Sequence, residues 1–110
     1  MSTAPLIRTL QDIERIESTA LSDRDLPSST FELIRRTAQA SPEAAALSFI
    51  ALGTGEETPL RLNYAELLGK ITQTANAFHR LGLRPGKAVS FLLPNLPQTH
   101  FTIWGGEAAG

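Results

Sequence analysis

Residues 63–86, Asn-Tyr-Ala-Glu-Leu-Leu-Gly-Lys-Ile-Thr-Gln-Thr-Ala-Asn-Ala-Phe-His-Arg-Leu-Gly-Leu-Arg-Pro-Gly, decide the fold. Asn63 and Glu66 have the reciprocal spacing of a capping box, in which both side chains accept hydrogen bonds from backbone amides at a helix start. Apolar residues then recur every three or four positions, at Tyr64, Leu67, Leu68, Ile71, Ala75, Phe78 and Leu81. Gly82 stands where a left-handed C-cap is needed, and Pro85 lies just beyond it. The sequence predicts an amphipathic helix of about five turns.

Downstream of this helix the sequence predicts a strand and a further helix. Residues 88–93 are nearly all apolar and bounded by turn residues, which is typical of a strand buried on both faces of a parallel sheet. Residues 94–97 contain two prolines that break the strand, and residues 98–109 predict a helix with Phe101, Trp104 and Ala108 on one face. Together they predict the first half of a βαβ unit, which a second parallel strand would complete.

Upstream, the sequence predicts a helix followed by a hairpin. Ser29 or Thr30 can cap the helix, and the pair Ser41-Pro42 ends it, because the residue before proline is pushed out of the helical region. Phe31, Ile34 and Ala38 share its apolar face. Residues 44–52 and 60–62 are strand candidates that we expect to pair antiparallel across the polar loop 53–59.

Residues 1–28 predict an N-terminal arm. Thr9 and Asp12 have the spacing to open a short helix with Leu10, Ile13 and Ile16 on one face, and residues 21–29 have the turn formers, charges and proline of a linker. The whole order of elements predicts an α/β fold, with an antiparallel hairpin and the start of a parallel βαβ sheet flanked by helices. We therefore divide the chain into an arm, residues 1–28, and a first α/β segment, residues 29–110.

Composition excludes several classes of protein. The chain of 110 residues is 42% hydrophobic and 19% charged, which is typical of a globular domain and not of a disordered one. Its 10 basic and 11 acidic residues are mixed along the sequence. Because the basic residues form no continuous stripe, nucleic-acid binding is disfavoured. Apolar runs are too short to span a membrane, and residues 1–20 lack the pattern of a secretion signal. The absence of cysteine excludes disulfides and thiolate chemistry, and we expect a cytoplasmic location.

Glycines and histidines are the first candidates for a functional site. The eight glycines are dispersed, and the one close pair, Gly53 and Gly55, is followed by acids that would repel a phosphate, which favours a hairpin turn. His79 lies at the edge of the apolar face of the long helix without partners at metal-ligand spacing, which favours a surface position. His100 lies within the helix that follows the predicted parallel strand. That helix begins at the edge of the sheet where ligands bind in such folds, but a structural role for His100 is favoured.

The remaining candidates also favour structural roles. The aromatic residues Tyr64, Phe101 and Trp104 have the helical spacing of core packing rather than of a stacking platform. Acidic and basic residues alternate over residues 14–25, which is typical of a solvated surface. The hydroxyls of residues 28–30 have no base partner, so helix capping is favoured over nucleophilic catalysis. We expect no catalytic, cofactor-binding or metal-binding residue in this chain.

Six short motifs, taken together, resemble a known family. In chain order they are Thr30-Phe31-Glu32-Leu33-Ile34, Ser41-Pro42-Glu43-Ala44-Ala45-Ala46, Leu62-Asn63-Tyr64-Ala65-Glu66-Leu67, Leu81-Gly82-Leu83-Arg84-Pro85-Gly86-Lys87-Ala88-Val89, Leu92-Leu93-Pro94-Asn95-Leu96-Pro97 and Ala108-Ala109-Gly110. Their order and spacing over residues 29–110 are similar to those of the adenylate-forming, or AMP-binding, acyl-CoA synthetases. Two departures, Asn63 for the usual threonine and Lys87 for the usual aspartate, fall at positions that are not catalytic in the family.

The resemblance implies a fold and a reaction. The fold is the N-terminal part of the large domain of an adenylate-forming enzyme. The parent enzyme would convert a carboxylic acid, of the fatty or aryl kind, to an acyl-adenylate with ATP and Mg²⁺, and then to a thioester with coenzyme A. In the family the phosphate-binding loop, the nucleotide contacts and the catalytic lysine lie downstream of the region matched here, so no such residue is carried over.

These implications lead to expectations about the chain itself. We expect the 110 residues to be a truncated N-terminal portion, to bind none of the cofactors, to be inactive alone, and to pair with the remainder of a parent chain. A strand at residues 88–93 without its parallel neighbour would expose edges that favour self-association. The alternative is a non-catalytic interaction module on the same scaffold. A nicotinamide-binding domain is disfavoured, because residues 94–97 replace the glycine motif that it requires.

Overall fold

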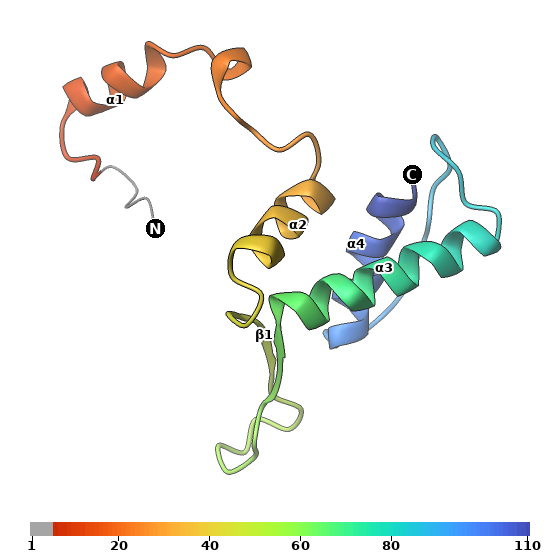
Figure 1. Ribbon diagram of the computed structural model, residues 1–110. Coiled ribbons are helices and arrows are strands. Elements are labelled where there is room, and N and C mark those ends of the chain that lie inside the picture. The colour runs from red at the N-terminus through yellow and green to blue at the C-terminus, as the bar shows by residue number, and fades with distance from the viewer. Residues whose placement is uncertain (1–5) are drawn as a thin grey trace.

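The computed structural model describes residues 6–110, which form helices and one small two-stranded sheet (Figure 1). In chain order the elements are α1 (Leu10–Glu17), the 3-10 helix η1 (Leu21–Asp23), α2 (Thr30–Ala40), β1 (Ala45–Phe49), β2 (Leu60–Asn63), α3 (Tyr64–Arg80) and α4 (Pro97–Ala109). Figure 1 shows α2, α3 and α4 grouped together, the hairpin projecting from the start of α3, and α1 lying apart from them. The mixture of helices with an antiparallel hairpin agrees with the predicted α/β class.

Helix α3 has the predicted caps at both ends. The Asn63 side chain accepts from the Glu66 amide at 2.8 Å, and the Glu66 carboxylate accepts from the Asn63 amide at 2.9 Å, which confirms the capping box. At the other end Gly82 has a φ of 94°, its amide donates to the His79 carbonyl, and the Leu83 amide donates to the Phe78 carbonyl. These two bonds form a Schellman motif, which satisfies carbonyls that the helix itself leaves free.

Helix α4 packs across α3 at a glycine. Gly105 is buried, and a Cβ built on it would lie 2.7 Å from the Thr74 side chain and 3.2 Å from the Ala75 amide nitrogen. The two helices therefore approach so closely that only a hydrogen atom fits at this position. Ile71, which is fully buried, lies in α3 one turn before this contact. The small core consists of Ala38, Leu67, Ile71, Leu83 and Ala109, together with Pro97 and Gly105 of α4.

The hairpin is antiparallel, as predicted, but its first strand is shorter than expected. Phe49 pairs with Leu60 and Leu47 with Leu62, with an irregularity between residues 45 and 47. The predicted strand over residues 44–52 ends at Phe49, because the loop begins there and the Glu57 carboxylate accepts hydrogen bonds from the amides of residues 52 and 53. Those amides are directed at the loop's own side chain and not at a neighbouring strand.

Helix α2 and the loop after it fix the start of α3. The Ser29 hydroxyl accepts from the Glu32 amide at 3.1 Å, which confirms the predicted cap, and α2 ends before Ser41 as the proline predicts. The carbonyls of Pro42 and Ala44 accept hydrogen bonds from the first two amides of α3, each at 3.1 Å. The loop therefore satisfies donors that a helix start leaves without intrahelical partners.

The predicted arm contains the expected helix, and its first five residues lie outside the described part of the chain. The Thr9 hydroxyl accepts from the Asp12 amide at 3.3 Å and the Asp12 carboxylate accepts from the Thr9 amide at 3.0 Å, so α1 also begins with a capping box. The Arg24 guanidinium donates to the carbonyls of Ile16 and Thr19, which holds the linker against the end of α1. The apolar side chains of α1 are mostly exposed.

The structure corrects the predicted strand at residues 88–93, and with it the start of a parallel sheet. Within residues 6–110 the sheet has two strands, β1 and β2, and residues 88–93 form no backbone hydrogen bond with any of these residues. The prediction of burial on both faces is also wrong, because Leu92 is 100% exposed. An apolar segment forms a strand only where a neighbouring strand can hydrogen-bond with its backbone. The described residues provide no such neighbour beside residues 88–93.

The chain exposes more surface than a compact protein of its size. Its accessible surface is 8337 Å², whereas a compact chain of this mass exposes about 6,000 Å². Its radius of gyration is 17.8 Å, against about 13 Å for a compact domain of 110 residues. The exposed large apolar side chains include Leu10 of α1, Leu60 of the hairpin and Leu92 before α4.

The close contact between α3 and α4 predicts opposite effects for two glycine substitutions. Gly105→Ala should lower the free energy of unfolding by about 1–3 kcal/mol, because the added methyl group overpacks against Thr74. Gly69→Ala, in the middle of α3 with nothing within 4 Å of its Cβ position, should raise it by up to about 1 kcal/mol through helix propensity. Urea unfolding followed by circular dichroism measures both, and equal effects of the two substitutions would contradict the packing described.

Candidate functional site

An open groove lies between residues 87–91 and helix α4. Its volume is about 270 Å³, and its apolar side chains come from Val89 and Phe91 on one side and Ile103 on the other. The two sides lie close together at Gly106, where a Cβ would come within 3.8 Å of Val89. A second hollow, of about 350 Å³, lies at the end of α3, where Phe78, Leu83 and Ala88 are among the residues that line it.

The far end of the groove is held in place by contacts to the end of α4. The Nε2 atom of His79 lies 2.8 Å from the Ala109 carbonyl oxygen. Because a carbonyl only accepts, the imidazole donates from Nε2 in this contact. A Cβ on Gly110 would lie 2.7 Å from the Pro85 nitrogen, so the helix end also abuts the turn after α3. His79 thus lies at the surface, where the ends of two packed helices meet, which agrees with the predicted surface position.

The polar groups of the groove are few. Lys87 and Glu107 are the charged residues that line it, and the Thr102 hydroxyl donates to the Gln98 carbonyl within α4 at 2.9 Å. No nucleophile in this lining stands next to a base, so its chemistry is that of an apolar binding surface with one ammonium and one carboxylate group.

The other residues singled out from the sequence do not line this groove. His100 is half-buried in the first turn of α4, and Tyr64, Phe101 and Trp104 are half-buried on their helices. The Gly53–Gly55 turn lies in the hairpin loop, where the Glu57 carboxylate accepts from the Leu52 amide at 2.8 Å and also from the Gly53 amide. The backbone amides that would have to bind a phosphate therefore donate hydrogen bonds to Glu57 instead. This agrees with the predicted hairpin turn.

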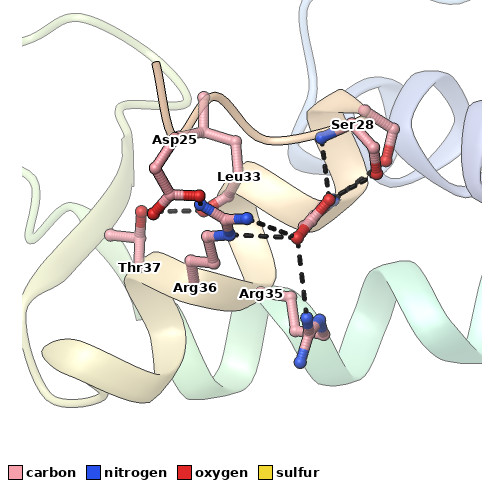
Figure 2. A network of polar contacts seen from close by, with 8 residues as sticks. Asp25, Ser28, Leu33, Arg35, Arg36 and Thr37 are labelled. Atoms are coloured by element: carbon pink, nitrogen blue, oxygen red, sulfur yellow. Dashed lines mark hydrogen bonds and ion pairs between the residues drawn. The ribbon is translucent and has the colours of Figure 1, made fainter. Parts of the chain in front are cut away.

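A polar cluster at the start of α2 joins the arm to the helices (Figure 2). The Glu32 carboxylate accepts from the Ser28 amide at 2.7 Å and from the Ser28 hydroxyl, and from the Arg36 guanidinium at 2.8 Å. Arg36 also donates to the Asp25 carboxylate at 3.0 Å. These hydrogen bonds, with those from Ser28 contributing most, lower the pKa of the Glu32 carboxyl from 4.5 to about 2. The cluster fixes the direction in which the linker enters α2.

Sequence reasoning found only part of these features. The cap at Ser29 was predicted, and the spacing of Glu32 and Arg36 is the helical i, i+4 spacing that signals an ion pair. The bond from Arg36 to Asp25 joins residues eleven positions apart in the irregular linker, for which the sequence offers no periodic signal. The groove was missed because it depends on how residues 87–91 lie against α4.

Within residues 6–110 no group of three or more His, Cys, Asp or Glu side chains is placed to hold a metal ion. None of the helices in this part of the chain combines the length and the apolar character that crossing a membrane requires.

Comparison with known proteins identifies the chain. The helices, the antiparallel hairpin and the apolar groove beside α4 together make up a mixed α/β chain. A family model described as AMP-binding enzyme matches residues 34–110, and the chain belongs to this family. A curated relative, the marinolic acid–CoA ligase of Pseudoalteromonas sp. (strain SANK 73390), is 30% identical over 102 residues, a match that covers 93% of this chain and 16% of the relative. No solved structure matches the chain.

The resemblance found in the six sequence motifs is thereby confirmed. The matched region begins inside α2 and includes the hairpin, α3, the turn after it and α4. In the structure the motifs correspond to caps and turns, such as the capping box at Asn63 and the left-handed Gly82. The family relationship of this chain is thus expressed in residues that shape its backbone.

The Glu32 cluster predicts a low carboxyl titration. Because the pKa in the folded chain, about 2, lies below the ordinary value of 4.5, the cluster is fully formed above pH 4.5 and is lost as the pH falls toward 2. NMR of the ¹³C-labelled Glu32 carboxyl should place its midpoint near the lower value. Ser28→Ala should raise the midpoint by removing the hydroxyl donor. Ser22→Ala is the matched control, because that hydroxyl donates to Asp23 and should leave the midpoint unchanged. A midpoint near 4.5 in the unmodified chain would show that the cluster does not form in solution.

Proposed function

We propose that this chain is the N-terminal portion of an ATP-dependent acyl-CoA ligase. The parent enzyme converts a carboxylic acid, of the fatty or aryl kind, to an acyl-adenylate and then to an acyl-CoA thioester. The observation that carries the proposal is the match of the AMP-binding family over residues 34–110. The similarity to a protein named as a CoA ligase supports coenzyme A as the thiol acceptor.

The role of the chain within this ligase is that of scaffold. The described residues do not fit ATP with Mg²⁺, because no set of carboxylates is grouped for a cation and the amides of the Gly53–Gly55 turn are bonded to Glu57. We therefore assign no step of the reaction to residues 6–110. In this proposal ATP, Mg²⁺ and coenzyme A are bound by the remainder of the parent chain, and the 110 residues alone are inactive.

The division of the chain follows the same proposal. Residues 1–28 form an arm, and residues 29–110 form the first α/β segment of the AMP-binding domain. We also propose a cytoplasmic location, which the metabolic role of such a ligase favours. The 110-residue chain is further proposed to self-associate through the apolar surface that it exposes at residues 88–93.

An exchange assay tests the ligase proposal. The purified 110-residue chain should give no acid-dependent exchange between ATP and radiolabelled pyrophosphate with a panel of fatty and aryl acids. A longer polypeptide, expressed from a reading frame that continues beyond Gly110, should catalyse this exchange and should form acyl-CoA when coenzyme A is added. The longer sequence should contain a loop rich in Ser, Thr and Gly followed by lysine.

Two results would overturn the proposal. Turnover by the 110-residue chain alone would show that its own residues carry the chemistry. A continuing reading frame without the phosphate-binding loop would remove the ligase assignment and favour a non-catalytic interaction module.

A further inference from the structure

Helix α1 owes its position to something other than apolar packing. None of its eight residues is buried, and Leu10 and Ile13 on its apolar face are 70% and 41% exposed. Figure 1 shows α1 apart from α2, α3 and α4. Because no packed face holds it, the helix is placed by the linker over residues 18–29 and by the polar contacts of that linker.

Arg24 binds the linker to the end of α1. Its Nε and Nη2 atoms lie 3.2 and 2.9 Å from the Thr19 carbonyl oxygen, and Nη2 also donates to the Ile16 carbonyl. The last carbonyls of a helix have no intrahelical partner and carry a partial negative charge, which a guanidinium complements. Arg24 and the last turn of α1 are therefore expected to move as one unit.

The next residue, Asp25, binds the linker to α2 (Figure 2). Its Oδ1 atom accepts from Nη1 of Arg36 at 3.0 Å. The Nε and Nη2 atoms of Arg36 donate to one oxygen of Glu32 at 3.0 and 2.8 Å. Because the guanidinium is planar and its donors have fixed directions, the two bonds to Glu32 aim Nη1 at Asp25. Two neighbouring residues of the linker thus connect α1 to α2.

The contacts on α2 differ in their exposure to solvent. Glu32 accepts from the Ser28 amide at 2.7 Å and from the Ser28 hydroxyl, and its side chain is 21% exposed. The Asp25 side chain, in contrast, is 91% exposed. Exposed ion pairs are weak and are screened by salt. The pair of Asp25 and Arg36 is therefore the contact that opens first, while Ser28 stays bound to Glu32.

We propose that Arg24, Asp25 and Arg36 form a salt-sensitive latch, which holds α1 in one orientation relative to α2 and releases it when the pair of Asp25 and Arg36 opens. In the released state Arg24 remains bound to α1, and the linker remains bound to α2 through Ser28. The movement is consequently confined to residues 25–27. This conformational device lies in the arm and in α2, and it does not depend on the ligase chemistry.

Spin labels on two cysteines measure the orientation of α1, because the chain has no cysteine of its own. Glu14→Cys on α1 and Gln73→Cys on α3 place both labels at exposed positions outside the latch. Double electron–electron resonance then gives the distribution of distances between them. We expect one narrow distribution at about 0.01 M salt and a broad one at about 1 M, where the Debye length falls to about 3 Å.

Removal of the Asp25 carboxylate tests the exposed ion pair. In the doubly labelled chain Asp25→Ala should lower the ratio of latched to released α1 by about two- to fivefold at low salt, the range of a single exposed pair. It should also abolish most of the salt dependence. Asp23→Ala is the matched control, because this carboxylate lies in the same linker and accepts from the neighbouring Ser22 hydroxyl. It should leave the distribution unchanged.

Removal of the Arg24 guanidinium tests the other half of the latch. Arg24→Gln should broaden the distribution at low salt, because α1 then turns independently of the linker. Arg15→Gln is the matched control, since Arg15 pairs with Asp12 within α1. Circular dichroism should show that all four variants keep their helices, so that a broader distribution reports a change in orientation and not unfolding.

Three results would overturn the latch. A broad distribution in the chain without further substitutions at low salt would show that α1 is not held. A narrow distribution that neither salt nor Asp25→Ala broadens would show that other contacts hold it. Equal broadening by Asp23→Ala and Asp25→Ala would show an effect of net charge and not of the ion pair. The exchange assay for the ligase is independent of each of these results.

Discussion

The close approach of α4 to α3 at Gly105 is the contact on which the arrangement of the C-terminal half depends. Because the Thr74 side chain occupies the space that a Cβ would take, α4 lies directly against α3. This brings the Ala109 carbonyl to His79 and Gly110 to the turn after α3. The connecting residues 83–96 must then span from one end of α4 to the other, which lays residues 87–91 along the helix and forms the groove. The absence of a side chain at Gly105 thus helps to position the groove along α4.

Acidic side chains have one recurrent role in the structure, which is to hold backbone amides. Asp12 and Glu66 complete capping boxes, Glu32 accepts from the amide that precedes the cap of α2, and Glu57 accepts from the hairpin loop. Each carboxylate satisfies donors that the local fold leaves free. These four acids therefore stabilise the local backbone conformation.

The residues that relate the chain to its family are also residues that set its backbone conformation. The AMP-binding match covers residues 34–110, and the residues that carry the resemblance there set helix starts, helix ends and turns. The groove beside α4 is apolar, and its two charged residues stand at separate elements. The residues matched to the family therefore specify backbone geometry, and the groove beside them is formed mainly by apolar side chains.

The sequence by itself determined the local structure. The capping pairs Thr9–Asp12 and Asn63–Glu66, the proline after α2 and the glycine after α3 placed helix boundaries to within a residue or two, because each acts through neighbours a few positions away. The conformation and the exposure of residues 88–93 were decided by the tertiary structure alone. Their apolar run predicted a buried strand, but burial and a hydrogen-bonded ladder need partners distant in sequence, and within the described chain these residues lie exposed and unpaired. The groove and the hydrogen bond from Arg36 to Asp25 could not be predicted from sequence periodicity either. Both form where an irregular segment contacts a helix.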